Sequence, residues 1–150
     1  MRKRILGLAV LVIIMTQATF ATNINDNVSK KVLATFNEKF VEAKEVSWST
    51  TDMYVKASFK LNEQFMFAYF SEMGELLGTT RNILIYQLPI NLQSELKKNL
   101  TSSWITELYE FTTEDETVYY ATIENADQKI MFRSEGMNAW SVFKRITKDF

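Results

Sequence analysis

The sequence contains neither cysteine nor histidine, and these two absences remove several functional classes. Without cysteine no disulfide can form, so packing alone must hold the fold together. Without either residue there is no Ser-His-Asp or Cys-His catalytic arrangement and no zinc site of the usual kind. We therefore expect a protein that is not an enzyme and has no catalytic residue, metal site or cofactor. An enzyme that uses paired carboxylates stays an alternative.

The chain also lacks an apolar run long enough to span a bilayer. Residues 5–15 form its longest apolar stretch, about 11 residues, whereas a membrane-spanning helix needs about 20. Three cations, Arg2, Lys3 and Arg4, precede this stretch, and small residues follow it. We predict that residues 1–21 are a secretory signal peptide, cleaved after Ala18 or Ala21. An uncleaved anchor helix is the alternative.

Removal of residues 1–21 takes away three cations and no acids, so the formal net charge changes from −1 to −4. A mildly acidic domain has no positive surface for nucleic acid or anionic lipid. We expect a periplasmic or secreted protein with no nucleic-acid partner and no stable membrane insertion after cleavage. Residues 22–150 are long enough for one domain with a sizeable core.

The hydrophobic pattern of the mature chain begins with a helix. Val32, Phe36 and Phe40 fall on one helical face, and Ser29 is a plausible N-cap. We expect this helix to end near Ala43.

The period then changes to two, and residues 46–78 read as strands around which the chain is organised. The strand near residue 57 places Val55, Ala57 and Phe59 on one face and Tyr54, Lys56, Ser58 and Lys60 on the other. Residues 65–70 are apolar on both faces, which indicates either a central strand or one that exposes an aromatic surface to a partner. Gly74 supplies a positive φ in the next turn, and residues 76–81 form a fourth strand.

The second half follows the same plan. Pro89, the only proline, precedes a helix with a row of leucines that Trp104 continues. Strands are predicted over residues 105–111, 118–124, 129–133 and 139–146, and the last places Trp140, Val142 and Ile146 on one face.

The order helix, then four strands, therefore occurs over about residues 28–83 and again over about 88–147. We predict an α+β fold, a tandem repeat of a helix plus four antiparallel strands. The strands would form one continuous sheet of about eight, with both helices on one face. The opposite sheet face would be partly open, and a partner could dock there.

Several segments together resemble the PepSY-like proteins of Bacteroidetes, often described as similar to β-lactamase-inhibitor proteins. The resemblance covers about residues 28–146 and implies an exported protein that binds or inhibits another exported protein, with no catalytic residue to transfer. Unlike well-studied β-lactamase inhibitor proteins, this chain has no disulfide. The segments that carry the resemblance are Phe36-x-x-x-Phe40, Val46-Ser47-Trp48, residues 54–59, the phenylalanine-rich strand ending at Phe70, Gly74-Glu75-Leu76-Leu77 and Leu88-Pro89.

Candidate binding residues lie on strands and in turns. We expect at most half of Tyr54, Tyr69, Tyr119 and Tyr120 to be buried, so that the others form an amphipathic surface. Acidic turn residues either insert into a partner's cleft or serve only turn geometry and solubility. The predicted partner-binding residues are Tyr54, Asp52, Glu63, Tyr69, Glu72 and Tyr120.

The three tryptophans, Trp48, Trp104 and Trp140, are expected to pack in the core, with an interface anchor as the alternative. The function that follows is an exported non-catalytic binding module for a protein or peptide in the envelope, a candidate inhibitor or regulator. The alternative is a sensor that binds an apolar small molecule in a pocket walled by Phe65, Phe67 and Tyr69.

Overall fold

The computed structural model describes residues 28–148. The predicted signal peptide lies outside the described residues. Two helices, a short 3-10 helix and eight strands make up the described part of the chain. In order they are α2 (Lys30–Lys39), β1 (Lys44–Thr50), β2 (Val55–Leu61), β3 (Gln64–Phe70), β4 (Leu76–Asn82), η3 (Ile85–Gln87), α3 (Ile90–Lys98), β5 (Trp104–Thr112), β6 (Thr117–Glu124), β7 (Gln128–Glu135) and β8 (Ala139–Thr147).

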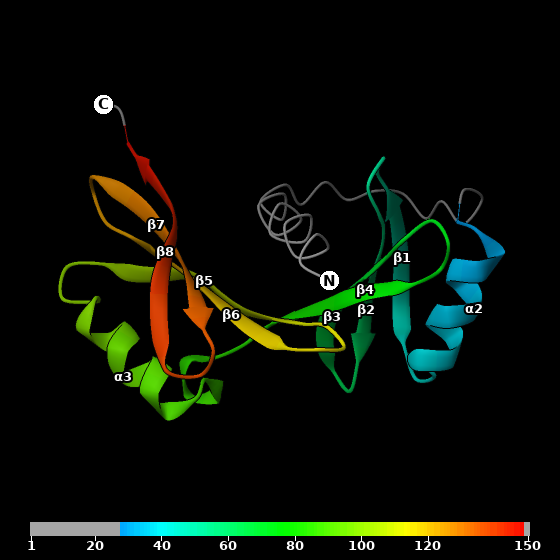
Figure 1. Ribbon diagram of the computed structural model, residues 1–150, viewed down its shortest axis with the longest axis horizontal. Coiled ribbons are helices and arrows are strands. Elements are labelled where there is room, and N and C mark those ends of the chain that lie inside the picture. The colour runs from blue at the N-terminus through cyan, green and yellow to red at the C-terminus, as the bar shows by residue number, and fades with distance from the viewer. Residues whose placement is uncertain (1–27, 149–150) are drawn as a thin grey trace.

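All eight strands form one antiparallel sheet in which each strand pairs with its neighbours in the sequence, from β1 to β8 (Figure 1). The predicted α+β class and the continuous sheet are confirmed. Each half contains one α-helix followed by four strands, while the origin of the halves as repeats stays a prediction. Pairing between the halves is short, since β4 and β5 pair only over residues 79–82 and 109–112.

Helix α2 begins and ends for local reasons. The Ser29 hydroxyl accepts a hydrogen bond from the backbone N–H of Val32 at 3.3 Å, as an N-cap does. The prediction that the helix continues to about Ala43 was wrong, because it ends at Lys39. Phe40 leaves helical geometry with φ −127°, and its ring packs against Phe59 of β2 with centroids 4.8 Å apart.

Helix α3 follows Pro89, as predicted, and buries Leu92 and Leu96 completely. Trp104 does not continue their row, so the prediction that it packs in the core was wrong. It begins β5 and is 54% exposed, because the helix has already ended at Lys98. Trp140 packs as predicted, and its indole N–H donates to the carbonyl of Leu92 at 3.0 Å.

Cross-strand pairing shows that both helices cover the same face of the sheet, as predicted. Residues paired across an antiparallel ladder point to one side. Ala57, under α2, pairs with Ala68, which pairs with Thr79, which pairs with Thr112 of β5. Four residues before Thr112 on the same strand, and hence on the same face, Leu108 shares a buried cluster with α3.

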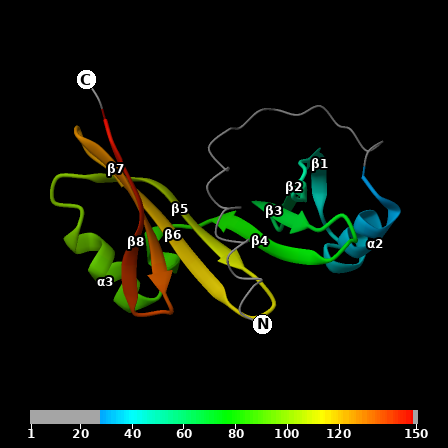
Figure 2. The same cartoon turned by 45° about the horizontal axis from the view of Figure 1, so that its top comes forward.

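The sheet is strongly bent. Its β1–β3 end and its β7–β8 end rise on the same side of the middle strands, and the two helices lie outside the bend (Figures 1 and 2). The face without helices is therefore the inner, concave face. We call it the helix-free face.

A bulge in β8 overturns one predicted side-chain direction. Val142 pairs with Phe132, but the register then shifts, and Ile146 pairs with Lys129. Since Lys129 and Phe132 point to opposite sides of β7, Ile146 lies on the helix-free face and not beside Trp140. The extra residue of a bulge causes such a reversal.

Candidate functional site

The middle of the helix-free face carries a buried cluster that spans both halves of the chain. It contains tyrosines contributed by four different segments, and Phe67, Leu77 and Phe143 are half-buried against it. We call this set the central cluster: Tyr54, Tyr69, Tyr109, Phe111, Val118, Tyr120 and Met131.

Ring geometry ties the cluster together. Tyr54 and Tyr69 meet edge to face with centroids 5.4 Å apart, and Tyr109 stacks on Tyr120 at 5.2 Å. Phe143 adds an edge contact to Tyr120 at 5.7 Å. Aromatic pairs at these separations are worth about 0.5–1.5 kcal/mol beyond the area that they bury. The two halves of the sheet therefore share one aromatic unit although few strand pairs join them.

The predicted tyrosines do come together, but they are more buried than expected. Tyr54, Tyr69 and Tyr120 all belong to the central cluster, and each is at most 5% exposed. Tyr119 points to the other face and is half-buried. The prediction that at most half of these four would be buried was therefore wrong, because the bend brings tyrosines from both halves against one another.

Three hydroxyl groups on this face are buried without a hydrogen-bond partner among residues 28–148, those of Tyr69, Thr80 and Tyr109. Burial raises the pKa of Tyr69 to about 12, and the nearby Thr80 hydroxyl partly opposes that shift. Burial also raises the pKa of Tyr109. Tyr120 differs, because its hydroxyl accepts a hydrogen bond from Nε of Arg133 at 3.3 Å.

Lysine side chains flank the aromatic rings on β2 and β3. The Lys56 ammonium lies 5.4 Å from the ring centroid of Phe67, and that of Lys60 lies 5.7 Å from Phe65, a ring that is 60% exposed. Lys60 also pairs with Glu63 at 3.2 Å and with Glu45 at 3.7 Å. Lys56 has no ion pair within the described part of the chain, and burial lowers its pKa.

The predicted acidic residues lie in exposed turns and are not brought together. Asp52 and Glu72 occupy the β1–β2 and β3–β4 turns at one end of the strands, and Glu63 occupies the β2–β3 turn at the other end. The carbonyl of Glu72 accepts a hydrogen bond from the Ser29 hydroxyl at 3.4 Å, which joins its turn to α2. Their part in binding stays a prediction.

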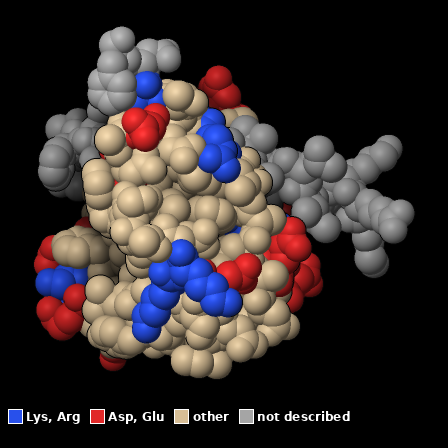
Figure 3. Space-filling model, turned by 90° about the vertical axis from the view of Figure 1, so that its left-hand side faces the viewer, with Lys and Arg blue, Asp and Glu red and all other residues tan. Residues whose placement is uncertain are grey.

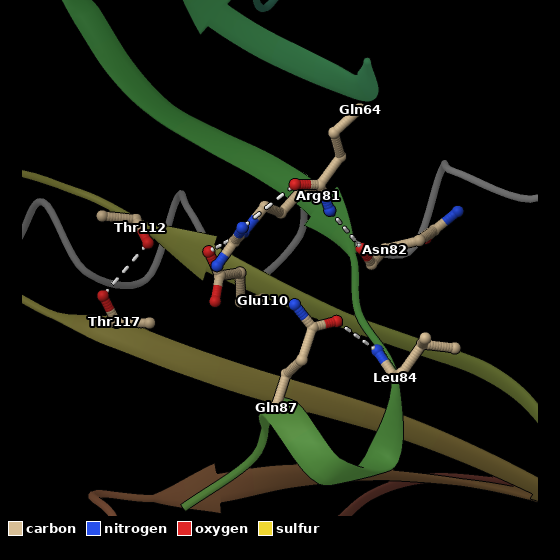
Figure 4. Close-up of polar contacts among 8 residues, drawn as sticks. All are labelled: Gln64, Arg81, Asn82, Leu84, Gln87, Glu110, Thr112 and Thr117. Carbon is tan, nitrogen blue, oxygen red and sulfur yellow. Dashed lines mark hydrogen bonds and ion pairs between the residues drawn. The ribbon is translucent and has the colours of Figure 1, made fainter. Parts of the chain in front are cut away.

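The opposite face is polar where the two halves meet. Arg81 of β4 forms an ion pair with Glu110 of β5 and donates to the side-chain oxygen of Gln64 at 3.0 Å (Figure 4). Thr112 and Thr117 share a hydrogen bond nearby at 3.0 Å. In the middle of the sheet, between the two helices, the polar contacts therefore lie on the face that carries the helices, and the aromatic residues lie on the helix-free face.

Two hollows in the described surface are lined by residues outside the central cluster. One, of about 540 Å³, is lined by residues 41–44 with Lys60, Asn62 and Glu63. A second, of about 310 Å³, is lined by Asn82, Ile83 and residues 105–108. Neither is lined by Phe65, Phe67 or Tyr69, the residues of the predicted small-molecule pocket.

Residues 28–148 contain no group of three or more acidic side chains placed to hold a metal ion. None of the helices among these residues is long and apolar enough to cross a bilayer. At the end of the molecule beside α3 and β8, basic and acidic side chains lie in small groups, some of them adjacent, on a mostly uncharged surface (Figure 3). Charge on this end is therefore interspersed.

Sequence reasoning missed Tyr109, Thr80 and Arg133 as parts of the site. Tyr109 lies on a strand whose alternation was not assigned to faces, and Thr80 is a small polar residue in a weakly patterned strand. The sequence did contain one signal, because residues two apart on a strand point to the same face. Tyr109 lies two residues before Phe111, and Arg133 two residues after Met131.

No protein-family model and no curated protein matches this sequence. Several solved structures match its fold. A DUF2874 family protein from Bacteroides ovatus has 16% identity and a TM-score of 0.71, covering 81% of this chain and 89% of that chain. A BLIP-like protein from Bacteroides fragilis has 16% identity and a TM-score of 0.68 over the same shares. A protein from Bacteroides eggerthii, provisionally described as periplasmic, has 10% identity and a TM-score of 0.71, covering 80% and 88%.

At these identities the likeness establishes the fold. The resemblance that the sequence indicated, to BLIP-like exported proteins of Bacteroidetes, is confirmed at that level.

Proposed function

We propose that this protein is an exported, non-catalytic binding module that engages another exported protein through its helix-free face. The helix-free face carries this proposal. The rings of the central cluster bury one another, but Phe65 beside them is 60% exposed, and no described helix covers this face. A sheet ordinarily packs its apolar face against a second layer, and a partner supplies that layer here.

The structural neighbours support the proposal. One is BLIP-like and another is provisionally described as periplasmic, which agrees with a location in the periplasm or outside the cell. The finer role that we assign is inhibition or regulation of the bound protein. The concave face suits this role, because it receives a convex surface such as the loop that borders an active site.

The small-molecule alternative has less support. Phe65, Phe67 and Tyr69 lie on the helix-free face as predicted, but Phe65 is exposed and the hollows described above are lined by other residues. Ligand sites for small apolar molecules are enclosed cavities that bury most of the ligand. An exposed ring beside a buried aromatic cluster on a curved sheet suits a protein surface better.

Site-specific photo-crosslinking in the source cells tests the proposal. A benzophenone side chain is introduced at Phe65, on the helix-free face, and separately at Ile90, on the outer surface at the start of α3. The two positions are similarly exposed, at 60% and 70%. We expect a covalent adduct of defined mass from position 65 and none from position 90.

Absence of an adduct at position 65, or the same adducts from both positions, would contradict the proposal. Where the captured partner is a hydrolase, its activity measured against increasing amounts of the purified protein then tests inhibition. Activity that does not change rules out the inhibitor role and leaves binding standing.

A further inference from the structure

A row of side chains crosses the helix-free face from one half of the sheet to the other. Lys56 pairs across the ladder with Tyr69 at one end. Tyr109 pairs with Tyr120, and Tyr120 with Arg133, at the other end. These are two separate ladders, because Gly78, the partner of Tyr69, and Asn82, the partner of Tyr109, lie four residues apart on β4. The row is therefore diagonal; it begins and ends with a cation and has tyrosines between. Five strand spacings of about 4.8 Å separate β2 from β7, and the shift of four residues adds about 13 Å along the strands, so the row measures about 27 Å along the sheet.

Both terminal cations have unused hydrogen-bonding capacity. Lys56 is half-buried and makes no ion pair among residues 28–148. Arg133 donates to Tyr120 and lies 3.7 Å from Glu116, a carboxylate that is more than half exposed. A guanidinium has five N–H donors, so these contacts leave most of them free.

Beneath the row, three buried hydroxyl groups also have unused hydrogen-bond donors. The hydroxyls of Tyr69, Thr80 and Tyr109 are buried and unpartnered within the described chain. A hydroxyl that donates to a carboxylate makes a short, charge-assisted bond. The Lys56 and Arg133 side chains and these hydroxyls therefore all offer donors to an acceptor with negative charge.

Acidic side chains on this face do not supply that acceptor. Glu107 lies on it but is engaged by Lys129 at 3.8 Å and by the Thr122 hydroxyl at 2.9 Å. Glu63 pairs with Lys60 at the end of the hairpin. Glu116 lies 3.7 Å from Arg133 but is more than half exposed, and Glu124 is paired with Lys148. Lys56 is thus the end of the row that has no ion pair among residues 28–148.

We infer that the helix-free face binds an acidic segment of its protein partner, laid across the strands with carboxylates between Lys56 and Arg133. This inference rests on the proposed function and adds the chemistry of the partner. An extended peptide advances about 3.3 Å per residue, so about eight residues span the row. Contact with the buried hydroxyls requires Phe67 and Phe143, which are half-buried against the cluster, to move aside.

Selection from a random dodecapeptide phage library tests this inference. The full chain is expressed with its N-terminal segment, so that the host makes any cleavage, and the product is immobilised for panning. We expect selected peptides to be enriched in Asp and Glu over the unselected library. A selected peptide, labelled with fluorescein, is then used to measure Kd by fluorescence anisotropy.

The variants Lys56→Gln and Arg133→Gln are each expected to weaken this binding about tenfold, the loss of one charged hydrogen bond. Lys97→Gln removes an exposed cation from α3, on the other side of the sheet, and is expected to change Kd less than twofold. Lys56→Arg keeps the charge and is expected to retain most of the affinity. Circular dichroism confirms that each variant is folded.

The outcomes separate the inference from the proposed function. Selected peptides without an excess of acidic residues, or acidic peptides that bind both Gln variants of the row normally, overturn the acidic segment alone. Selection of no binder at all overturns both. Acidic peptides that lose affinity in Lys56→Gln and Arg133→Gln, but not in Lys97→Gln, support both.

Discussion

Replacing Tyr109 by phenylalanine is expected to stabilise the free protein. The Tyr109 hydroxyl is buried and has no partner among residues 28–148, and a buried hydroxyl without a hydrogen bond costs about 1–3 kcal/mol. Phenylalanine keeps the ring and so the stacking on Tyr120. Removal of the oxygen also leaves a small void, which subtracts from the gain. We expect the free energy of unfolding to rise by about 1 kcal/mol.

Tyr120→Phe is the matched control. It changes the other ring of the same stacked pair, but here the hydroxyl accepts a hydrogen bond from Arg133 at 3.3 Å. Phenylalanine leaves that donor without its partner, so we expect the free energy of unfolding to fall by about 1 kcal/mol. Two substitutions of the same chemistry, on rings in contact, thus have opposite signs.

Urea denaturation followed by tryptophan fluorescence measures both changes, with unchanged m-values showing that the same surface is exposed on unfolding. If Tyr109→Phe lowers the free energy of unfolding by 1 kcal/mol or more, its hydroxyl has a partner in the free protein, and the reasoning is refuted. The result also bears on function, because Tyr109→Phe is expected to weaken binding of an acidic peptide while it strengthens the fold.

Three further outcomes are expected from urea denaturation. Gly74→Ala should lower the free energy of unfolding by about 2–4 kcal/mol, because its φ is +87° and a Cβ would lie 2.9 Å from the α2 backbone. Gly136→Ala, with φ +63° and open space around it, should lower it by about 1 kcal/mol. Equal losses would contradict the contact with α2. The pKa of Tyr69 is about 12 in the folded protein, above the ordinary 10. Its contribution to the free energy of unfolding is therefore full below pH 10, and about 2–3 kcal/mol is lost as the pH rises from 10 to 12. Tyr69→Phe should lose that dependence on pH. Hydrogen bonding to Lys148 lowers the pKa of Glu124 in the folded protein, so Glu124→Gln should be less stable than the parent protein at pH 7. The two proteins should be equally stable once the pH falls below the pKa of Glu124 in both the folded and the unfolded chain. A difference in stability that persists in acid would count against the ion pair as its cause.

Local periodicity predicted the strands and the helix-covered face well. The alternation of Val55, Ala57 and Phe59 with polar residues identified both a strand and its buried side, since burial of one face imposes a period of two. Ser29 and Pro89 marked the helix starts because caps and proline act within one turn. These features depend on neighbours in the sequence, and the sequence displays them.

Features that depend on the bend of the sheet were not predictable in the same way. The burial of Tyr54, Tyr69 and Tyr120 follows from curvature that brings β3, β5 and β6 together on one face, and no alternation within a strand encodes curvature. A single bulge moved Ile146 to the opposite side. The alternation within its own strand placed Lys56 on the correct face. Its position relative to Arg133 could not be predicted, because that depends on the register of every strand between them.

Sequential strand order has a consequence for how the chain folds. Each strand pairs only with the strand before or after it, so sheet formation closes short loops, except between β4 and β5, where η3 and α3 intervene. A low average separation between contacting residues favours fast folding, which suits a chain that has no disulfides to hold a partly formed structure. Contacts between β8 and α3 join residues that are further apart in the sequence. The Trp140 backbone N–H donates to the Glu95 carboxylate at 3.2 Å, and its indole N–H donates to the Leu92 carbonyl. Docking of the last strand onto α3 is therefore the step that completes the C-terminal half.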